Sequence, residues 1–193
     1  MILGVAGRNA AGKGAALAYL AGRGFRVLSL SDVLRDELAR AGVEETRERM
    51  IAFGREFRER EGPAALATRV LEQIEAGRDC AIDSIRHPAE VDTLAQGAEH
   101  FRLLWIDAEP ALRFERMRAR GRPGDPESFE VFRELEAREL RGERPGDQHL
   151  LAVEAAAHDR VPNDGAVDEL EARLDALLAR YRPVGESSER GSR

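Results

Sequence analysis

A glycine-rich segment near the start of the chain has the residue types and spacing of a phosphate-binding site. Residues 7–13 read GRNAAGK and match the pattern G-x-x-x-x-G-K. Glycines let backbone amides curl around an oxyanion, and the N-terminus of a following helix adds a positive field. We therefore predict a phosphate loop at residues 7–13; the alternative is a glycine-rich turn that binds nothing. The predicted nucleotide contacts are Gly7, Asn9, Ala10, Ala11, Gly12, Lys13, Gly14 and Ala15.

The lysine of this loop is unusual in its own sequence. The chain has 30 basic residues, and Lys13 is the only one that is not arginine. A lysine presents a compact ammonium group, whereas the guanidinium of arginine is broad and planar. Lys13 lies at the end of the phosphate loop, which indicates that a lysine is needed there for binding. The alternative is that one lysine remained by chance among the arginines.

A second group of polar residues follows the apolar segment at 80–83. An acidic residue at the end of a buried strand beside a phosphate loop can orient Mg²⁺ and its waters, and Asp83 has this place. Arg86 lies three residues further on and can reach a transferring phosphoryl group. In the alternative interpretation Asp83 is only a turn residue. Phosphoryl transfer needs no strong base, so we interpret His87 as the first residue of a helix and not as a catalyst.

These residues must be positioned by strands that alternate with helices. Apolar segments predict strands at 1–6, 25–30, 80–83, 101–107 and 158–161. Helices are predicted at 13–22, 31–42, 46–61, 64–76, 88–96, 110–120, 127–141, 148–157 and 166–182, with Ser31 and Asp32 where an N-cap belongs. The alternation predicts an α/β fold, a five-stranded parallel sheet with helices on both faces. Ligands of such sheets bind at the carboxyl ends of the strands.

Composition excludes several classes of protein. A chain of 193 residues suits one domain, here 1–182, followed by a disordered tail at 183–193. The single cysteine, Cys80, allows no internal disulfide and indicates a reducing compartment, which we take to be the cytoplasm. No apolar run approaches the ~20 residues that span a bilayer, so no membrane association is expected. The net charge of −6 argues against binding of nucleic-acid polymers.

Two motifs resemble those of a known superfamily. The run G-K-G at 12–14 resembles the adenylate-kinase branch of the nucleoside monophosphate kinases, which typically reads G-K-G-T, so Ala15 departs by lacking a hydroxyl. The run AIDSIRHP at 81–88 resembles the D-G-F-P-R segment of those kinases. It is also similar to P-loop relatives such as archaeal dephospho-CoA-kinase-like proteins and kinase-like domains beside deoxycytidylate deaminases. The resemblance implies ATP and Mg²⁺ as cofactors, with Mg²⁺ held largely through waters.

The resemblance also suggests where the phosphate acceptor binds. Residues 31–35, SDVLR, are similar to a kinase segment whose arginine grips the acceptor phosphate. This implies substrate contacts at Asp32, Arg35 and Arg86 within an acceptor-binding insert at about 31–76; otherwise Arg35 is an exposed residue of a capped helix. Gly54 interrupts a predicted helix where nothing structural requires glycine, so Arg55 is either a second acceptor contact or part of a solvated face.

An arginine-rich region at about 113–146 resembles the lid of the same kinases. Its arginines are 113, 116, 118, 120, 122, 133, 138, 141 and 144. Lid arginines neutralise charge in the transition state, and we select Arg118 and Arg122 as catalytic and Arg138 as a substrate contact. Some of these arginines also form helix-surface ion pairs. The loop at 162–165, PNDG, resembles one that lies beside adenine, which makes Asn163 a nucleotide contact or a helix-capping turn residue.

Together these observations predict transfer of the γ-phosphoryl group of ATP to a small phosphorylated acceptor, first of all a (deoxy)nucleoside monophosphate. One alternative is a dephospho-CoA-kinase-like reaction on an alcohol, with Asp32 as the base. Another is a regulatory module that binds nucleotide without turnover, which Ala15 would favour. Nothing in the sequence indicates the oligomeric state.

Overall fold

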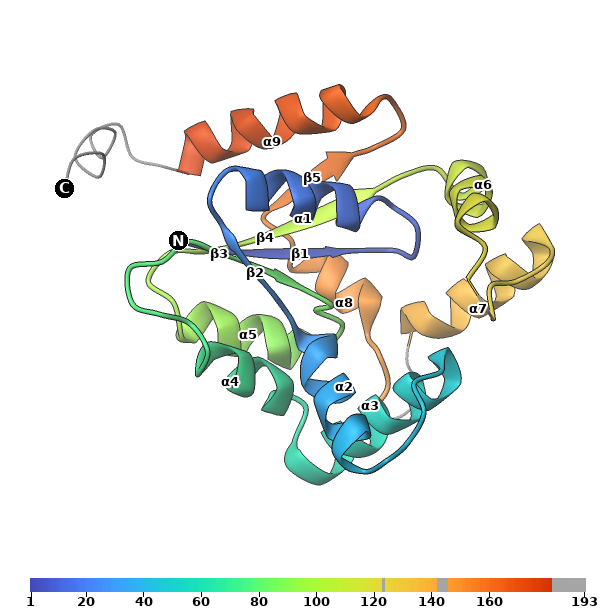
Figure 1. Cartoon of the computed structure of the whole chain (residues 1–193). Helices are drawn as coiled ribbons and strands as arrows, with labels where there is room; N and C mark the ends of the chain where they lie inside the picture. The colour runs from blue at the N-terminus through green and yellow to red at the C-terminus, as the bar shows by residue number, and fades with distance from the viewer. Residues whose placement is uncertain (123, 142–145, 182–193) are drawn as a thin grey trace.

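The computed structural model of the chain describes residues 1–122, 124–141 and 146–181. Its five strands form one parallel sheet, which confirms the predicted fold class. The strands are β1 (Ile2–Gly7), β2 (Arg26–Ser29), β3 (Cys80–Asp83), β4 (Phe101–Asp107) and β5 (Asp159–Pro162). Their order across the sheet is β2-β3-β1-β4-β5 (Figure 1). The predicted tail at 183–193 lies outside the described residues.

Strand β1 occupies the centre of the sheet because both of its faces are apolar. All six of its residues are buried, and it pairs with β3 on one side and β4 on the other. The register aligns Val5 with Asp83 and Gly7 with Ile106. The residues after β1, β3 and β4 therefore meet at one edge of the sheet, where ligands of parallel sheets bind.

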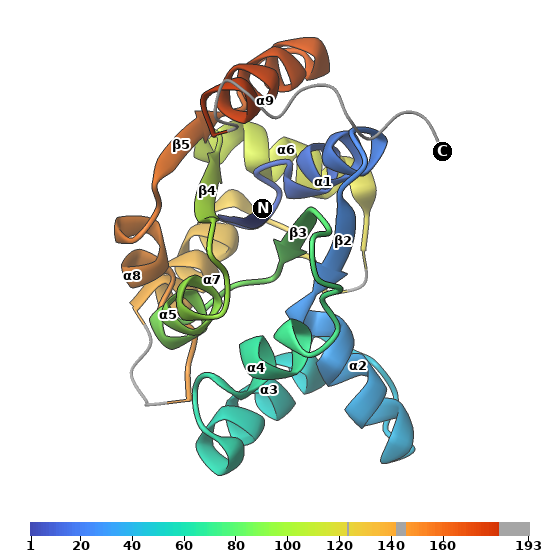
Figure 2. The same cartoon turned by 90° about the vertical axis from the view of Figure 1, so that its left-hand side faces the viewer.

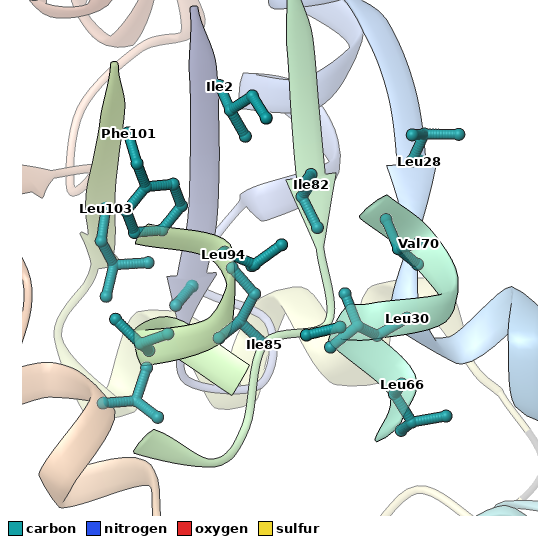
Figure 3. Close-up of a cluster of buried hydrophobic side chains, with 14 of the residues drawn as sticks. Ile2, Leu28, Leu30, Leu66, Val70, Ile82, Ile85, Leu94, Phe101 and Leu103 are labelled. Carbon is teal, nitrogen blue, oxygen red and sulfur yellow. The ribbon is translucent and has the colours of Figure 1, made fainter. Parts of the chain in front are cut away.

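Helices cover both faces of the sheet, as Figures 1 and 2 show. One face carries α1 (Lys13–Gly22) and α9 (Val167–Tyr181), whose leucines pack against Leu3, Val5 and Leu104. The other face carries α4 (Ala65–Leu71), α5 (Pro88–Gln96) and α8 (Leu150–Ala155). On this second face Val70 and Leu94 join Ile82 and Leu103 in one apolar cluster (Figure 3). Burial of these side chains is the main stabilising contribution to the fold.

The remaining helices form the walls beyond the carboxyl edge of the sheet. They are α2 (Leu30–Arg40), α3 (Arg47–Glu61), α6 (Pro110–Arg120) and α7 (Phe129–Arg141). Helices α2 and α3 lie beyond the end of β2, and α6 and α7 lie on the opposite side of the edge (Figure 1). Among the described residues, no helix combines the length and the apolar character that a membrane span requires.

Three details of the sequence prediction are wrong. The cap of α2 is Ser29, whose side chain accepts a hydrogen bond from the Ser31 backbone at 3.3 Å, so the helix begins earlier than predicted. Helix α4 ends at Leu71 rather than at 76. Helix α3 runs through Gly54 without interruption, and this glycine has a packing role, because an added Cβ would lie 3.2 Å from Leu34 Cδ1.

Candidate functional site

A cavity of about 680 Å³ opens at the carboxyl edge of the sheet. Four regions of the sequence contribute most of its polar lining: the phosphate loop, the acceptor-side helices α2 and α3 with the loop between them, the loop after β3, and the end of α6 with the residues that follow it. Its charged and polar lining includes Asn9, Lys13, Ser31, Arg35, Glu45, Arg58, Ser84, Arg86, Arg120 and Arg122. Apolar side chains of α2, α3, α4 and α8 complete the wall, so the cavity offers both cationic and apolar contacts to a small ligand.

The phosphate loop is built as predicted between β1 and α1. Ala10 and Gly12 have positive φ angles of 60° and 99°, which turn the backbone back on itself. Lys13 Nζ donates hydrogen bonds to the carbonyl oxygens of Gly7 and Arg8 at 2.9 and 3.0 Å. The ammonium group thus lies over its own loop, at the cavity lining.

The surroundings of Lys13 favour an anionic ligand. Burial lowers the pKa of Lys13 to about 8, and the positive charge of Arg86 contributes to the shift, while the negative charge of Asp83 opposes it. A group whose charged form is disfavoured in this way is stabilised when an opposite charge binds beside it. A phosphate group in the loop would supply that charge.

Asn163 braces the phosphate loop from behind. Its side-chain Nδ2 donates a 2.8 Å hydrogen bond to the carbonyl of Ala11, and its backbone nitrogen donates to Asp107 at 2.7 Å. A Cβ on Gly12 would lie 2.0 Å from the Asn163 amide, so only glycine fits there. Asn163 is 5% exposed. The structure therefore places it as a support of the loop backbone, a role that the sequence interpretation did not include.

A second brace consists of buried ion pairs. Arg113 is fully buried, pairs with Glu136 through two hydrogen bonds, and donates from Nε to the Ala108 carbonyl at 2.8 Å. Its Nη1 also contacts the carbonyl of Asn9 at 3.4 Å. Arg8 lies 3.8 Å from the same Glu136. These contacts fasten α6 and α7 to the phosphate loop, so Arg113 has a structural position within the predicted lid.

Asp83 lies at the end of β3, as predicted, directly beside Ser29 in the sheet register. Its Oδ2 accepts a hydrogen bond from Ser84 Oγ at 3.2 Å. Its Oδ1 is buried and has no hydrogen-bond partner among the described residues. Within those residues no group of three or more potential ligands could hold a metal ion directly. A single carboxylate with one unsatisfied oxygen fits Mg²⁺ that is held through water and nucleotide phosphates.

Arg86 reaches the cavity from the loop after β3. Its Nη1 donates to Gln148 Oε1 at 3.0 Å, and its backbone nitrogen donates to Glu90 Oε2 at 2.8 Å. Glu90 is fully buried and pairs with Arg58 at 3.1 Å. Burial raises the pKa of Glu90, although the Arg58 charge and the hydrogen bonds oppose the shift. The buried Arg58–Glu90 pair thus fixes the backbone that carries Arg86. Sequence reasoning missed this pair and selected Arg55.

Arg35 lines the acceptor side of the cavity and already has two carboxylate partners. Its Nε donates to Glu45 at 2.9 Å and its Nη1 donates to Asp32. The hydrogen bond to Glu45 is the main cause of a raised pKa of Arg35. Neither Asp32 nor Arg55 is among the residues that line the cavity. The structure therefore brings Arg35 and Arg86 into the cavity but not the other two predicted acceptor contacts.

The predicted lid arginines divide by helix face. Arg120 and Arg122 line the cavity, and Arg120 donates to Asn9 Oδ1 at 3.2 Å. Arg118 and Arg138 are exposed and do not line it, while Arg144 lies outside the described residues. Arg116, which the prediction did not select, has a buried Nη1 without a hydrogen-bond partner in the described part of the chain. That atom would lie 4.0 Å from a Cβ on Gly12.

Helical periodicity explains this division and could have revealed it. Arg113, Arg116 and Arg120 are spaced i, i+3 and i+7, which places them on one face of α6. Arg118 falls between these positions and projects from another face. The spacing therefore identifies the arginines that turn toward the loop.

Sequence comparison finds relatives along nearly the whole chain. A UPF0200 protein of Methanothrix thermoacetophila is 34% identical over 177 residues, which cover 92% of this chain and 96% of the relative. A UPF0200 protein of Hyperthermus butylicus is 32% identical over 188 residues, which cover 96% of this chain and 97% of the relative. No family model matches the sequence.

Solved structures with the same fold include kinases. A shikimate kinase from Bacteroides thetaiotaomicron has a TM-score of 0.58 and 14% identity, with 93% of this chain and 98% of that chain covered. A gluconokinase from Sinorhizobium meliloti has a TM-score of 0.53 and 14% identity, with coverages of 92% and 91%. At these identities the likeness establishes the fold, which is that of the P-loop kinases.

Proposed function

This chain belongs to the UPF0200 family, and we propose that it is an ATP-dependent phosphotransferase whose acceptor is a small phosphorylated molecule, first of all a (deoxy)nucleoside monophosphate. The observation that carries the proposal is the single cavity that joins Lys13 of the phosphate loop to Arg35, Arg86, Arg120 and Arg122. Donor and acceptor phosphates held there would meet at the carboxyl edge of the sheet.

Catalysis in this proposal consists of positioning and charge neutralisation. Lys13 binds the β- and γ-phosphates of the donor as a point charge. Arg86, Arg120 and Arg122 approach the transferring group from the other walls and stabilise the charge that spreads over its oxygens. Arg116 would contact the nucleotide beside Gly12, because its buried Nη1 has no hydrogen-bond partner in the described part of the chain.

A metal ion fits the same arrangement. When bound, Mg²⁺ would neutralise part of the charge on the donor phosphates. Asp83 would hold it through water with the buried Oδ1, and the absence of a hydroxyl at Gly14 is consistent with such indirect binding. Buried Arg58 and Glu90 keep the neighbouring Arg86 in place.

The nature of the acceptor follows from the cations that face it. Arg35 and Arg86 can each bind a phosphate through two hydrogen bonds, and this geometry favours an acceptor that already carries a phosphate. Phosphorylation of an alcohol is the second candidate, because Nε and Nη1 of Arg35 already donate to Glu45 and Asp32. The predicted base for that reaction, Asp32, is paired with Arg35 and lies outside the cavity lining.

Formation of ADP from ATP and Mg²⁺ over a panel of acceptors tests the proposal. Nucleoside monophosphates should support turnover, and the corresponding nucleosides and dephospho-CoA should support little. A better rate with an unphosphorylated acceptor would replace the first candidate by the second. ATP binding without turnover on any acceptor would indicate a regulatory module, and Lys13→Ala provides the blank for contaminating kinases.

A further inference from the structure

Ser84 has an unfavourable backbone conformation for a residue with a side chain. Its φ angle is 65°, and only Ala10 shares a positive φ among the non-glycine residues that the structure describes. The left-handed region costs a serine about 1 kcal/mol or more relative to glycine. Such strain persists where the side chain or its surroundings need it. Ser84 lines the cavity, whereas Asp83, the residue before it, is not among the lining residues.

The hydroxyl of Ser84 stands in the middle of a directed chain of hydrogen bonds. The Ser31 backbone donates to Ser29 Oγ, Ser29 Oγ donates to Ser84 Oγ at 3.2 Å, and Ser84 Oγ donates to Asp83 Oδ2 at 3.2 Å. Each hydroxyl in the chain both accepts and donates, so the bonds polarise one another in the same direction. The chain runs from the first turn of α2 to the carboxylate of Asp83.

The result is a carboxylate whose two oxygens have different surroundings. Oδ2 is held by the Ser84 hydroxyl, while Oδ1 is buried without a partner in the described residues. A carboxylate that is anchored at one oxygen cannot rotate freely about its terminal bond. Its other oxygen therefore keeps one direction, which a metal-bound water requires.

We propose that Ser84 is a positioning residue that holds Asp83 by one oxygen and thereby directs the other toward the hydrated metal of the nucleotide. This inference rests on the proposed function. The strain at Ser84 is retained because glycine, which the backbone would favour, lacks the hydroxyl. The same hydrogen bonds connect the first turn of the acceptor-side helix α2 with the carboxylate of Asp83.

Two substitutions separate the hydroxyl from the backbone. Ser84→Gly and Ser84→Ala both remove the hydroxyl, but only the glycine variant relieves the strain. Both should lower kcat by about two- to tenfold, the factor of one lost hydrogen bond. Both should weaken Mg²⁺ binding, titrated by calorimetry with ADP present, by a similar factor. The glycine variant should nevertheless melt about 2–4 °C above the alanine variant.

The inference can fail because activity and stability are expected to respond differently in the glycine variant. Its kcat and Mg²⁺ affinity should fall as in the alanine variant, while its melting temperature should be the higher of the two. It is overturned if the glycine variant keeps the wild-type kcat and Mg²⁺ affinity, or if only the less stable alanine variant loses them. Asp83→Asn distinguishes a failure of the proposed metal role of Asp83 from a failure of the proposed role of Ser84. If that variant transfers phosphate normally, the metal role of Asp83 in the proposed function is wrong. If it is inactive while both Ser84 variants behave as wild type, only the role of Ser84 is wrong.

Discussion

The two sides of the cavity are stabilised in different ways. On the nucleotide side, Asn163 and Arg113 hold the phosphate loop through buried hydrogen bonds and a buried ion pair. On the acceptor side, the buried Arg58–Glu90 pair holds α3, but Arg35 of α2 is held only by Glu45 and Asp32, and these three side chains are 46–64% exposed. Buried polar groups that lose a partner cost about 1–3 kcal/mol, whereas exposed ion pairs contribute about 0.2–1 kcal/mol.

This difference indicates a division of tasks. A phosphate loop that is fixed before the ligand arrives loses little conformational freedom on binding, which favours a tightly positioned donor. The contacts of Arg35 can be exchanged at small cost, so an acceptor phosphate can replace a carboxylate there. The nucleotide side is therefore expected to tolerate few substitutions, whereas the surroundings of Arg35 on the acceptor side can adapt.

Replacement of Lys13 should have the largest effect. Lys13→Ala and Lys13→Arg are both expected to lower kcat/KM by about 10³-fold, because one is uncharged and the other too broad for the loop. Steady-state ADP formation measures the loss, and circular dichroism should show an unchanged fold. Wild-type turnover by the arginine variant would contradict the assignment of the loop.

Removal of Arg35 and of Arg86, one at a time, should separate acceptor binding from the chemical step. Each lost charge-assisted contact is expected to change the affected kinetic constant by about 10–100-fold. Arg35→Ala should appear mainly in the KM of the acceptor, and Arg86→Ala mainly in kcat, because Arg86 lies nearer the transferring group. The KM for ATP should change little in either. An equal effect of both variants on kcat would mean that the two sides are not distinct.

Loss of the Asn163 amide tests the brace. Asn163→Ala leaves the Ala11 carbonyl without its buried partner, and the free energy of unfolding should fall by about 1–3 kcal/mol. The dissociation constant for ATP, measured by calorimetry, should rise about tenfold as the loop loosens. Arg173→Ala removes an exposed contact to Pro162 in the neighbouring strand and serves as the matched control. Similar behaviour of the two variants would argue against a brace.

The lowered pKa of Lys13 predicts a pH dependence confined to the nucleotide side. Between the folded value of about 8 and the ordinary value of 10.5, the unfolded chain binds more protons than the folded one. Stability should therefore rise with pH in this window, by up to about 1 kcal/mol from pH 8 to 9. Urea unfolding of wild type against Lys13→Met isolates this contribution. Saturating ATP should abolish it, since bound phosphates restore the charged form.

The smallest effect is expected at Glu45. Glu45→Gln removes an internal competitor for Arg35, so the acceptor KM should fall by up to about fivefold with kcat unchanged. Glu37→Gln is the matched control, because Glu37 also pairs with arginines of this region but lies outside the cavity lining. A higher KM for the Glu45 variant would show that Glu45 contacts the acceptor instead.

The sequence was sufficient for the fold and for the parts of the site that are continuous in the chain. Apolar strands alternating with helices fixed the class, and residues 7–13, Asp83 and Arg86 lie where their position after a strand predicted. Such features depend on neighbours in sequence, and local patterns report them directly.

Contacts between distant segments could not be predicted in the same way. Asn163 and Ala11 are separated by 152 positions, and the residues around neither of them predict their hydrogen bond. Arg113 was counted among the lid arginines without a role of its own, and its ion-pair partner Glu136 comes from another helix. Among the selected lid arginines, Arg122 lines the cavity, whereas Arg118 lies on another face of α6 than Arg116 and Arg120.

The isolation of Lys13 among arginines makes the chain a substrate with one scissile bond for a lysine-specific endoproteinase. Cleavage between Lys13 and Gly14 would produce only two fragments, residues 1–13 and 14–193. A protease needs an extended, accessible backbone, and here that backbone is the start of α1 behind a braced loop. The rate of this single cut therefore reports how often the loop opens, because the protease has no other cleavage site in the chain. A bound nucleotide should slow it, and loss of the Asn163 amide should accelerate it.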